Sequence, residues 1–343
     1  MNNILLNYLN GTDTPAIVYS ETLIYDAFRK IRGYLDPQIK ILYSVKANRN
    51  RDVVRTISKY ADGLEFSSIS EMSLFEDLET RKYCSIPGLT MPDVEKLLKA
   101  KININFDSIN QVQKFSSEVE ELPIGVRVRN TNDNSRFGTN YGEKELELLS
   151  KMNIKIGRLH YHFDNKDLAS FRDSVQYVES LLETRYLQEL TEVDFGGGAF
   201  DFIANGEWAN YCKIINDFSE RHPNIMVMIE PGQAFIGNNG FLVTSVVDIK
   251  EDIHTLVLDS SKFILFTWHT PILLNNSEQE GIKYRICGNS CAEGDVFCDE
   301  VVIKEAREGM KLVFFPAGAY VSSMARTLHA YEIPKESLCY DIL

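Results

Sequence analysis

The sequence predicts an α/β protein in which a (β/α)8 TIM-like barrel is followed by a C-terminal β domain. Short apolar runs alternate with segments of helical periodicity up to about Gly232, and strand-like runs with short turns follow it. A chain of 343 residues can bury the cores of two domains. We therefore expect a barrel domain over residues 20–235, and a β domain over residues 236–343 that includes an N-terminal strand, residues 1–19.

Eight apolar runs supply the expected barrel strands. They are IKILYSV (39–45), DGLEFSS (62–68), YCSIPG (83–88), ININFDS (102–108), IGVRVRN (124–130), RLHYHF (158–163), EVDFGGG (192–198) and IMVMIEPG (225–232). Helix-like segments lie between several of them, for example MPDVEKLLKA (91–100) and EWANYCKIINDFSERH (207–222). This alternation implies a parallel sheet with right-handed crossovers, and eight strands close a barrel. An open doubly wound sheet is the alternative.

The flanking segments follow the same reasoning. PAIVYS (15–20) would make a ninth parallel strand, so we expect it to join the β domain, and ETLIYDAFRKIRGYL (21–35) leads into the barrel. After Gly232 the runs are strand-like and show almost no helical period. They are FLVTSVVDIKED (241–252), HTLVLDSS (254–261), YRICGNS (284–290), DEVVIK (299–304) and KLVFFPAG (311–318).

Composition excludes several classes of protein. The formal net charge of −13 argues against a nucleic-acid binder, which needs a basic surplus to displace counterions. No run of 18 apolar residues appears, and the N-terminus lacks the pattern of a signal peptide, so we expect a cytoplasmic protein without membrane association. The six cysteines form no C-x-x-C pair, which argues against a disulfide scaffold or a zinc site. Free thiols and no metal are expected.

Unusual residues stand where the expected strands end, which is where barrel enzymes place their reacting groups. Lys46 follows the first run, in YSVKAN. It is either a solvated lysine or a lysine that forms an imine with a carbonyl cofactor. His160 and His162 lie on the same side of an extended chain, and Glu230 ends the last run. Each of these three has an ordinary reading too, as a structural histidine or a surface carboxylate.

Three successive glycines, Gly196, Gly197 and Gly198, separate a predicted strand from a predicted helix. Their backbone N–H groups can close around an anion, although a plain flexible turn has the same sequence. Each signal is weak when taken singly. Their convergence on one end of a barrel indicates an active site there.

These residues belong to ordered motifs that resemble those of the fold-type III pyridoxal-phosphate decarboxylases. This group includes ornithine, diaminopimelate and carboxynorspermidine decarboxylases and has an alanine racemase-like fold. The motifs cover nearly the whole chain: TPAIVYSETL, YSVKAN, GLEFSSISE, NFDS, SRFG, HYH, DFGGG, EPG, CGNSCAEGD and GAY. The resemblance implies a decarboxylase with pyridoxal 5'-phosphate as its cofactor.

The resemblance also implies roles for individual residues. Lys46 would hold the cofactor as an imine, and His162 would stack on the pyridine ring. The three glycines and the Tyr320 hydroxyl would bind the phosphate. Glu230 would keep the ring nitrogen protonated, which makes the ring an electron sink for loss of carbon dioxide. Racemases of this fold are known for an arginine at that place, so Glu230 favours decarboxylation.

The loop CGNSCAEGD resembles the one that carries the acid for reprotonation of the substrate, which here would be Cys291. The same loop contains Asp295, which is expected to contact the substrate. In the family this loop reaches the active site of the other subunit, so the resemblance implies a homodimer with shared sites. Cys287 and Cys298 are read as structural.

Departures from the family pattern narrow the substrate. Ala292 stands where ornithine and diaminopimelate decarboxylases are expected to carry an acidic residue, and neutral Gln233 replaces the usual arginine near the phosphate. Asp164 and Asn165 replace the usual Gly-Ser, so Asp164 turns away from the phosphate or serves the substrate. Arg136, in SRFG, is a further expected substrate contact. These departures look closest to the carboxynorspermidine branch.

The predicted reaction is therefore decarboxylation of a 3-amino-3-carboxypropyl group, as in carboxynorspermidine or carboxyspermidine. One alternative is the same chemistry in the tailoring of a microcin C-type peptide-nucleotide antibiotic. Further alternatives are an ornithine, lysine or diaminopimelate decarboxylase, an amino-acid racemase, and a regulatory paralogue without catalysis.

Overall fold

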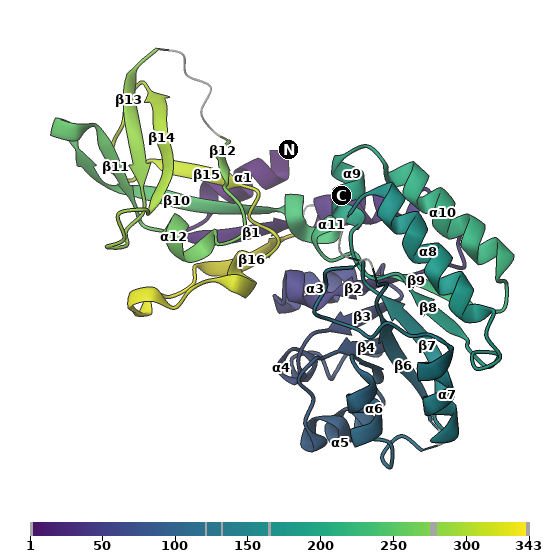
Figure 1. Ribbon diagram of the computed structural model, residues 1–343. Coiled ribbons are helices and arrows are strands. Elements are labelled where there is room, and N and C mark those ends of the chain that lie inside the picture. Colours follow the sequence, from purple (N-terminus) through teal and green to yellow (C-terminus); the bar gives the residue numbers. More distant parts are fainter. Residues whose placement is uncertain (1–2, 121, 132, 164–165, 275–279, 341–343) are drawn as a thin grey trace. The chain divides into compact units, whose positions relative to one another are not determined.

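The computed structural model describes residues 3–120, 122–131, 133–163, 166–274 and 280–340. The chain forms two compact units (Figure 1). The barrel unit consists of Phe28–Lys46 and Ser58–Ala234, and the sheet unit consists of Met1–Ala27, Ala47–Ile57 and Phe235–Leu343. Among the described residues, no helix combines the length and the apolar character needed to span a membrane.

Eight parallel strands form a closed barrel, as the sequence predicts. Each strand pairs with the next along the chain, and the last returns to the first where Ile41 lies opposite Ile229. Five lie wholly within the predicted apolar runs, and the strands that begin at residues 81, 123 and 155 start one to three residues before theirs. The strands are β2 (Lys40–Ser44), β3 (Gly63–Phe66), β4 (Arg81–Ser85), β5 (Asn103–Phe106), β6 (Pro123–Val128), β7 (Lys155–Tyr161), β8 (Glu192–Asp194) and β9 (Met226–Ile229).

One helix precedes the first barrel strand and the others come after barrel strands, and several begin at a side-chain cap. Ser68 accepts a hydrogen bond from the Glu71 N–H (3.1 Å), and Asp167 accepts one from the Ser170 N–H (2.9 Å). Such caps satisfy an otherwise unpaired amide, so the chain turns from strand to helix within a few residues. The helices are α2 (Glu21–Arg32), α3 (Arg51–Ile57), α4 (Ile69–Ser73), α5 (Met91–Lys99), α6 (Ile109–Lys114), α7 (Glu143–Lys151), α8 (Leu168–Leu182), α9 (Ala199–Ala204) and α10 (Trp208–Arg221).

A chain of polar side chains runs through the barrel interior. The Arg158 guanidinium donates to Glu192 Oε2 (2.7 Å) and to Asn105 Oδ1 (2.7 Å). Asn105 Nδ2 donates to Ser85 Oγ (3.1 Å), which lies 3.4 Å from His160 Nδ1. Arg158, Asn105 and His160 are all buried. Buried polar groups are tolerated where they bond to one another, so this chain holds His160 in a fixed orientation.

The sheet unit is built on an eight-stranded sheet in which β1 (Ala16–Ser20) pairs with β10 and β16. PAIVYS therefore joins this sheet and not the barrel, as predicted. A helix that sequence analysis did not predict, α1 (Asn3–Gly11), precedes β1 within the segment expected to be a strand. It buries Leu5 and Leu9 in a cluster that also contains Val18 of β1. These burials explain why the segment is helical.

The other strands of the sheet unit are β10 (Gly240–Lys250), β11 (Thr255–Leu258), β12 (Ile272–Leu273), β13 (Ile282–Cys287), β14 (Val296–Ile303), β15 (Lys311–Phe315) and β16 (Lys335–Cys339). Its short helices are α11 (Gln233–Ile236), which begins in the barrel unit, and α12 (Lys262–Leu265), with 3-10 turns at Gly237–Asn239, Glu251–Ile253, Ser322–Met324 and Leu328–Ala330. Each of the six cysteines is a free thiol.

Candidate active site

Lys46 lies directly beyond the first barrel strand, in the 3-10 turn η1 (Val45–Ala47) that follows β2. Its Nζ is 3.5 Å from Oε2 of Glu65, which is 1% exposed on β3. The same oxygen accepts a hydrogen bond from the Ser44 hydroxyl (2.6 Å). The side chain of Lys46 is 40% exposed. A buried carboxylate thus holds an accessible amine at the carboxyl end of the barrel.

Two buried carboxylates and a buried histidine meet at the same end. Glu230 follows β9 directly, and its Oε2 lies 3.4 Å from Nε2 of His160 on β7. Asp194 ends β8, and its Oδ1 accepts a hydrogen bond from the Gly196 N–H (2.8 Å). All three side chains are at most 2% exposed.

The two carboxyl groups respond in opposite ways to this environment. Burial is the largest cause that raises the pKa of Asp194, and the charge of Glu230 raises it further. Burial also favours the neutral form of Glu230, but the neighbouring His160 and Lys46 outweigh it, so the pKa of Glu230 lies below its usual value. The arrangement therefore favours a proton on Asp194 and a negative charge on Glu230.

His162 lies against the glycine turn that follows β8. A Cβ added at Gly196 would lie 3.0 Å from Cδ2 of His162, and one at Gly197 would lie 3.4 Å from its Nε2. Gly196 and Gly198 have positive φ angles (63° and 128°), which side-chain-bearing residues rarely adopt. Burial, followed by the charges of Lys166, Lys46 and Arg127, lowers the pKa of His162. A neutral imidazole thus covers one side of an open backbone turn.

Buried polar atoms without partners mark the place that a bound molecule would complete. Glu230 Oε1, Asp194 Oδ2 and His160 Nε2 have no hydrogen-bond partner within the part of the chain that the structure describes. Buried polar atoms are nearly always hydrogen-bonded, so a protonated ring nitrogen facing Glu230 would supply the hydrogen bond that its carboxylate lacks. The amine, the anionic carboxylate, the neutral imidazole and the glycine turn together fit a flat aromatic aldehyde that carries an anionic group.

Comparison with known proteins agrees with this site. Residues 21–237, well over half of the chain, match the family model described as pyridoxal-dependent decarboxylase, pyridoxal binding domain. This chain belongs to that family. The protein is therefore a decarboxylase whose cofactor is pyridoxal phosphate, and the predicted fold, family, enzyme class and cofactor are confirmed.

The decarboxylase has named relatives of more than one kind. It is 26% identical to a diaminopimelate decarboxylase from Aquifex aeolicus, over 91% of this chain and 83% of the relative. It is also 26% identical to a carboxynorspermidine/carboxyspermidine decarboxylase from Herminiimonas arsenicoxydans, over 86% of this chain and 84% of the relative. Its fold resembles that of a lysine decarboxylase from Selenomonas ruminantium, with a TM-score of 0.84, 20% identity, and coverage of 100% and 97%.

Three predicted residues of this decarboxylase belong to the sheet unit. Cys291 presents an exposed thiol in the loop between β13 and β14. Tyr320 has a positive φ of 57°, and its N–H donates to the Ala47 carbonyl (2.8 Å). Asp295 is 2% exposed and accepts hydrogen bonds from the Phe263 N–H (2.9 Å) and the Ser290 N–H (3.0 Å). These bonds hold the loop together, and the substrate contact that the sequence predicts for Asp295 stays a prediction.

The remaining predicted residues receive less support. Arg136 is exposed, and its guanidinium lies 4.1 Å from the centroid of the Phe137 ring. Gln233 is half-buried at the start of α11. Asp164 and Asn165 lie outside the described residues. The roles assigned to these residues from the sequence stay predictions.

The sequence contained signals for residues that went unassigned. Glu65 and Asp194 each interrupt an otherwise apolar strand run, and charged residues are seldom fully buried without a function or a partner. Both stand inside motifs that carried the resemblance. Lys166 had no such signal, because its place beside the glycine turn depends on the path of the loop after β7.

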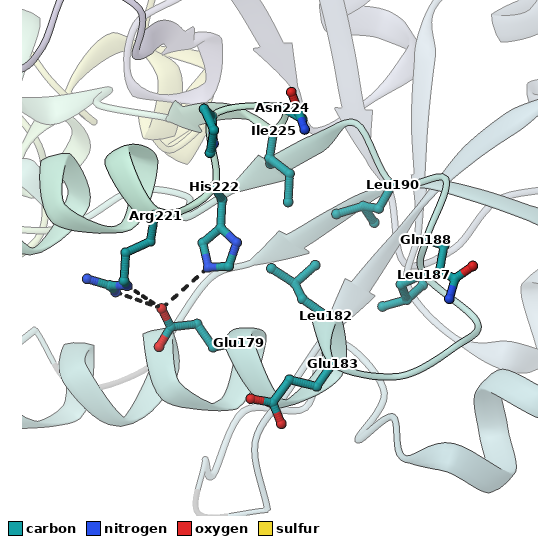
Figure 2. Close-up of a pocket in the computed structure, with 11 residues that line it drawn as sticks. Glu179, Leu182, Glu183, Leu187, Gln188, Leu190, Arg221, His222, Asn224 and Ile225 are labelled. Carbon is teal, nitrogen blue, oxygen red and sulfur yellow. Dashed lines mark hydrogen bonds and ion pairs between the residues drawn. The ribbon is translucent and has the colours of Figure 1, made fainter.

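A surface pocket of about 820 Å³ lies at the opposite end of the barrel, before β8 and β9 (Figure 2). Leucine side chains from α8 and the following segment form part of its wall. The Glu179 carboxylate accepts from Arg221 at 2.6 Å and lies 3.5 Å from His222 Nε2. Barrel enzymes carry their chemistry at the carboxyl ends of the strands, so this pocket is separate from the site around Glu230.

Proposed function

We propose that this decarboxylase removes the carboxyl group from a 3-amino-3-carboxypropyl substrate such as carboxynorspermidine or carboxyspermidine. The loop between β13 and β14 carries the argument. Ala292 offers only a methyl group where a carboxylate would bind the far ammonium of ornithine, lysine or diaminopimelate, and the Asp295 carboxylate is occupied by backbone amides. A relative named for carboxynorspermidine and carboxyspermidine supports this choice. The antibiotic alternative has no such support.

The residues of the site would divide the work as follows. Pyridoxal phosphate, when bound, accepts the electrons that remain as carbon dioxide leaves. Lys46 would supply the amine that attaches the cofactor, and Glu230 would hold a proton at the ring nitrogen. His162, kept neutral by burial and by nearby cations, would cover one face of the ring.

Binding of the phosphate and return of the proton would use further residues. Gly196, Gly197 and Gly198 would turn their N–H groups toward the phosphate, together with the Tyr320 hydroxyl. Cys291 would donate a proton to the substrate Cα. In domain terms, residues 20–235 would bind the cofactor, and residues 236–343 with 1–19 would supply the acid. We expect a cytoplasmic homodimer.

A screen for carbon dioxide release tests the substrate. The candidates are carboxynorspermidine, carboxyspermidine, ornithine, lysine, diaminopimelate and an aminocarboxypropyl phosphoester. We expect the first two to have the highest kcat/KM. Preference for a diamino acid would contradict the argument from Ala292, and loss of chirality without release of carbon dioxide would indicate a racemase.

We expect Cys291→Ala to slow product formation about 10²- to 10⁴-fold, because a positioned acid contributes that much to a rate. Cofactor binding should be unchanged. Pyridoxamine phosphate should accumulate, since the proton would more often reach the wrong carbon. Cys298→Ala, which removes a half-buried thiol of the adjacent strand, is the matched control. Normal turnover without pyridoxamine phosphate would assign Cys291 to a structural role.

Mixing two inactive variants tests whether sites are shared between subunits. Lys46→Ala and Cys291→Ala homodimers should each be nearly inactive. After exchange of subunits, the mixture should regain activity, because one of its sites combines an intact Lys46 with an intact Cys291. A mixture that exchanges subunits, as native mass spectrometry would verify, and stays inactive would rule out shared sites.

A further inference from the structure

Lys166 lies beside the glycine turn and is fixed there. Its Nζ donates hydrogen bonds to the carbonyls of Phe163 and Gly197, the latter at 3.3 Å, and lies 3.9 Å from the centroid of the Phe163 ring. Asp167, the next residue, caps α8 and so fixes the backbone. The ammonium is thereby held against the backbone of the turn.

The side chain of Lys166 lies against the last glycine of the turn. A Cβ added at Gly198 would lie 3.0 Å from Cδ of Lys166 and 3.4 Å from its Cε. A Cβ added at Gly196 would meet His162, and one at Gly197 would lie 3.3 Å from the Glu230 carbonyl oxygen and 3.4 Å from His162 Nε2. The His162 imidazole and the Lys166 side chain therefore both border the turn, next to different glycines.

The phosphate of the cofactor carries nearly two negative charges and needs a cation near it. Gln233, at the place where the family usually has an arginine, is neutral. Lys46 is paired with Glu65 and is the amine proposed for covalent attachment, and Arg127 lies 3.7 Å from Asp107. Lys166 reaches the turn itself, because its Nζ donates a hydrogen bond to the Gly197 carbonyl.

We propose that Lys166 supplies the positive charge that binds the cofactor phosphate at the glycine turn. The proposal rests on the proposed function, in which this turn is the phosphate site. It explains how the chain can dispense with an arginine at Gln233. The charge of Lys166 is already felt in the site, because after burial it is the largest cause that lowers the pKa of His162.

Binding of pyridoxal phosphate and of pyridoxal to the cofactor-free protein provides the test. Both ligands have the same ring and aldehyde, but only the first has a phosphate. Lys166→Met should raise the Kd for pyridoxal phosphate about 10- to 100-fold, the effect of removing one hydrogen bond to a charged group. The Kd for pyridoxal should change less than about twofold. Lys166→Arg should retain most of the phosphate-dependent affinity.

Two further variants test whether the charge of Lys166, and its position, cause the effect. Lys166→Gln removes the charge but keeps an N–H donor for the carbonyls, so it should behave as Lys166→Met does if charge is what matters. Lys151→Met removes a lysine whose side chain is 69% exposed and should alter neither Kd. Thermal unfolding followed by circular dichroism would verify that each variant is folded.

Gly197→Ala separates failure of this proposal from failure of the phosphate site itself. Gly197 has no positive φ, so alanine can adopt its backbone conformation, while its methyl group would crowd the turn at 3.3 Å from the Glu230 carbonyl oxygen. If Gly197→Ala selectively weakens pyridoxal phosphate and the Lys166 variants do not, Lys166 is not the cation. If neither change is selective for the phosphate, the turn is not the phosphate site. Equal weakening of both ligands by Lys166→Met would show a structural role and overturn the proposal.

Discussion

Glu230→Gln is expected to lower the rate of decarboxylation by several powers of ten, each equivalent to about 1.4 kcal/mol of activation free energy. The substitution keeps the size of the side chain and one oxygen acceptor but removes the negative charge. A neutral amide cannot hold a proton at the ring nitrogen, so the electrons released with carbon dioxide lose their main acceptor. Cofactor affinity should change much less, because the phosphate is held separately.

Single-turnover decarboxylation by cofactor-saturated enzyme measures this effect without interference from binding. Glu183→Gln is the matched control, because it makes the same chemical change at an exposed glutamate in the pocket at the other end of the barrel. It should have no measurable effect. Equal rates for wild type and Glu230→Gln would remove Glu230 from the catalytic machinery.

Ionisation of Asp194 is expected to offset part of the charge that Glu230→Gln removes. The charge of Glu230 is, after burial, the main cause that raises the pKa of Asp194, so Glu230→Gln makes ionisation of Asp194 easier. Part of the negative charge can then return to the site. The double variant Asp194→Asn, Glu230→Gln should therefore be slower than Glu230→Gln alone.

Lys46→Ala is expected to abolish covalent attachment of the cofactor and to reduce activity by several powers of ten. The reason is that Lys46 offers an accessible amine at the carboxyl end of β2, held 3.5 Å from the Glu65 carboxylate. Borohydride reduction of the wild type followed by proteolysis should yield a cofactor-modified peptide that contains Lys46. The variant should yield none.

Lys40→Ala is the appropriate control, because Lys40 begins the same strand and is paired with Asp62 at 3.4 Å. It should still give the modified peptide. Modification of a different lysine in the wild type would show that the attachment site has been assigned wrongly.

The barrel could be predicted from the sequence because its strands are short, apolar and buried on both faces, which leaves a continuous signal for each one. The residues that follow strands, such as Lys46 and Glu230, were found by the same logic. The helix α1 was missed because its stability comes from packing Leu5 and Leu9 against other parts of the sheet unit. The opposite pKa shifts of Asp194 and Glu230 depend on which charges surround each carboxyl group. No local pattern in the chain carries that information.

Asp295 shows a different limit of sequence reasoning. An acidic residue in a loop that carries a proposed catalytic cysteine reads naturally as a ligand for the substrate. The structure shows a role within the loop, because the Phe263 and Ser290 amide groups donate hydrogen bonds to its oxygens. The sequence shows that this loop carries a carboxylate. It does not show which backbone amide groups bind that carboxylate.

Within the described residues, two buried carboxyl oxygens of the site, Glu230 Oε1 and Asp194 Oδ2, have no hydrogen-bond partner, and this has a cost in stability. A buried polar group without a hydrogen bond costs roughly 1–3 kcal/mol of folding free energy. Apolar residues of similar shape at these positions would make a more stable barrel, yet they would remove the groups proposed to bind the cofactor ring. Such positions are where attempts to make the enzyme more heat-resistant would most easily destroy it. Thermostabilising substitutions should therefore be sought in the outer helices and loops, leaving the polar interior of the barrel untouched.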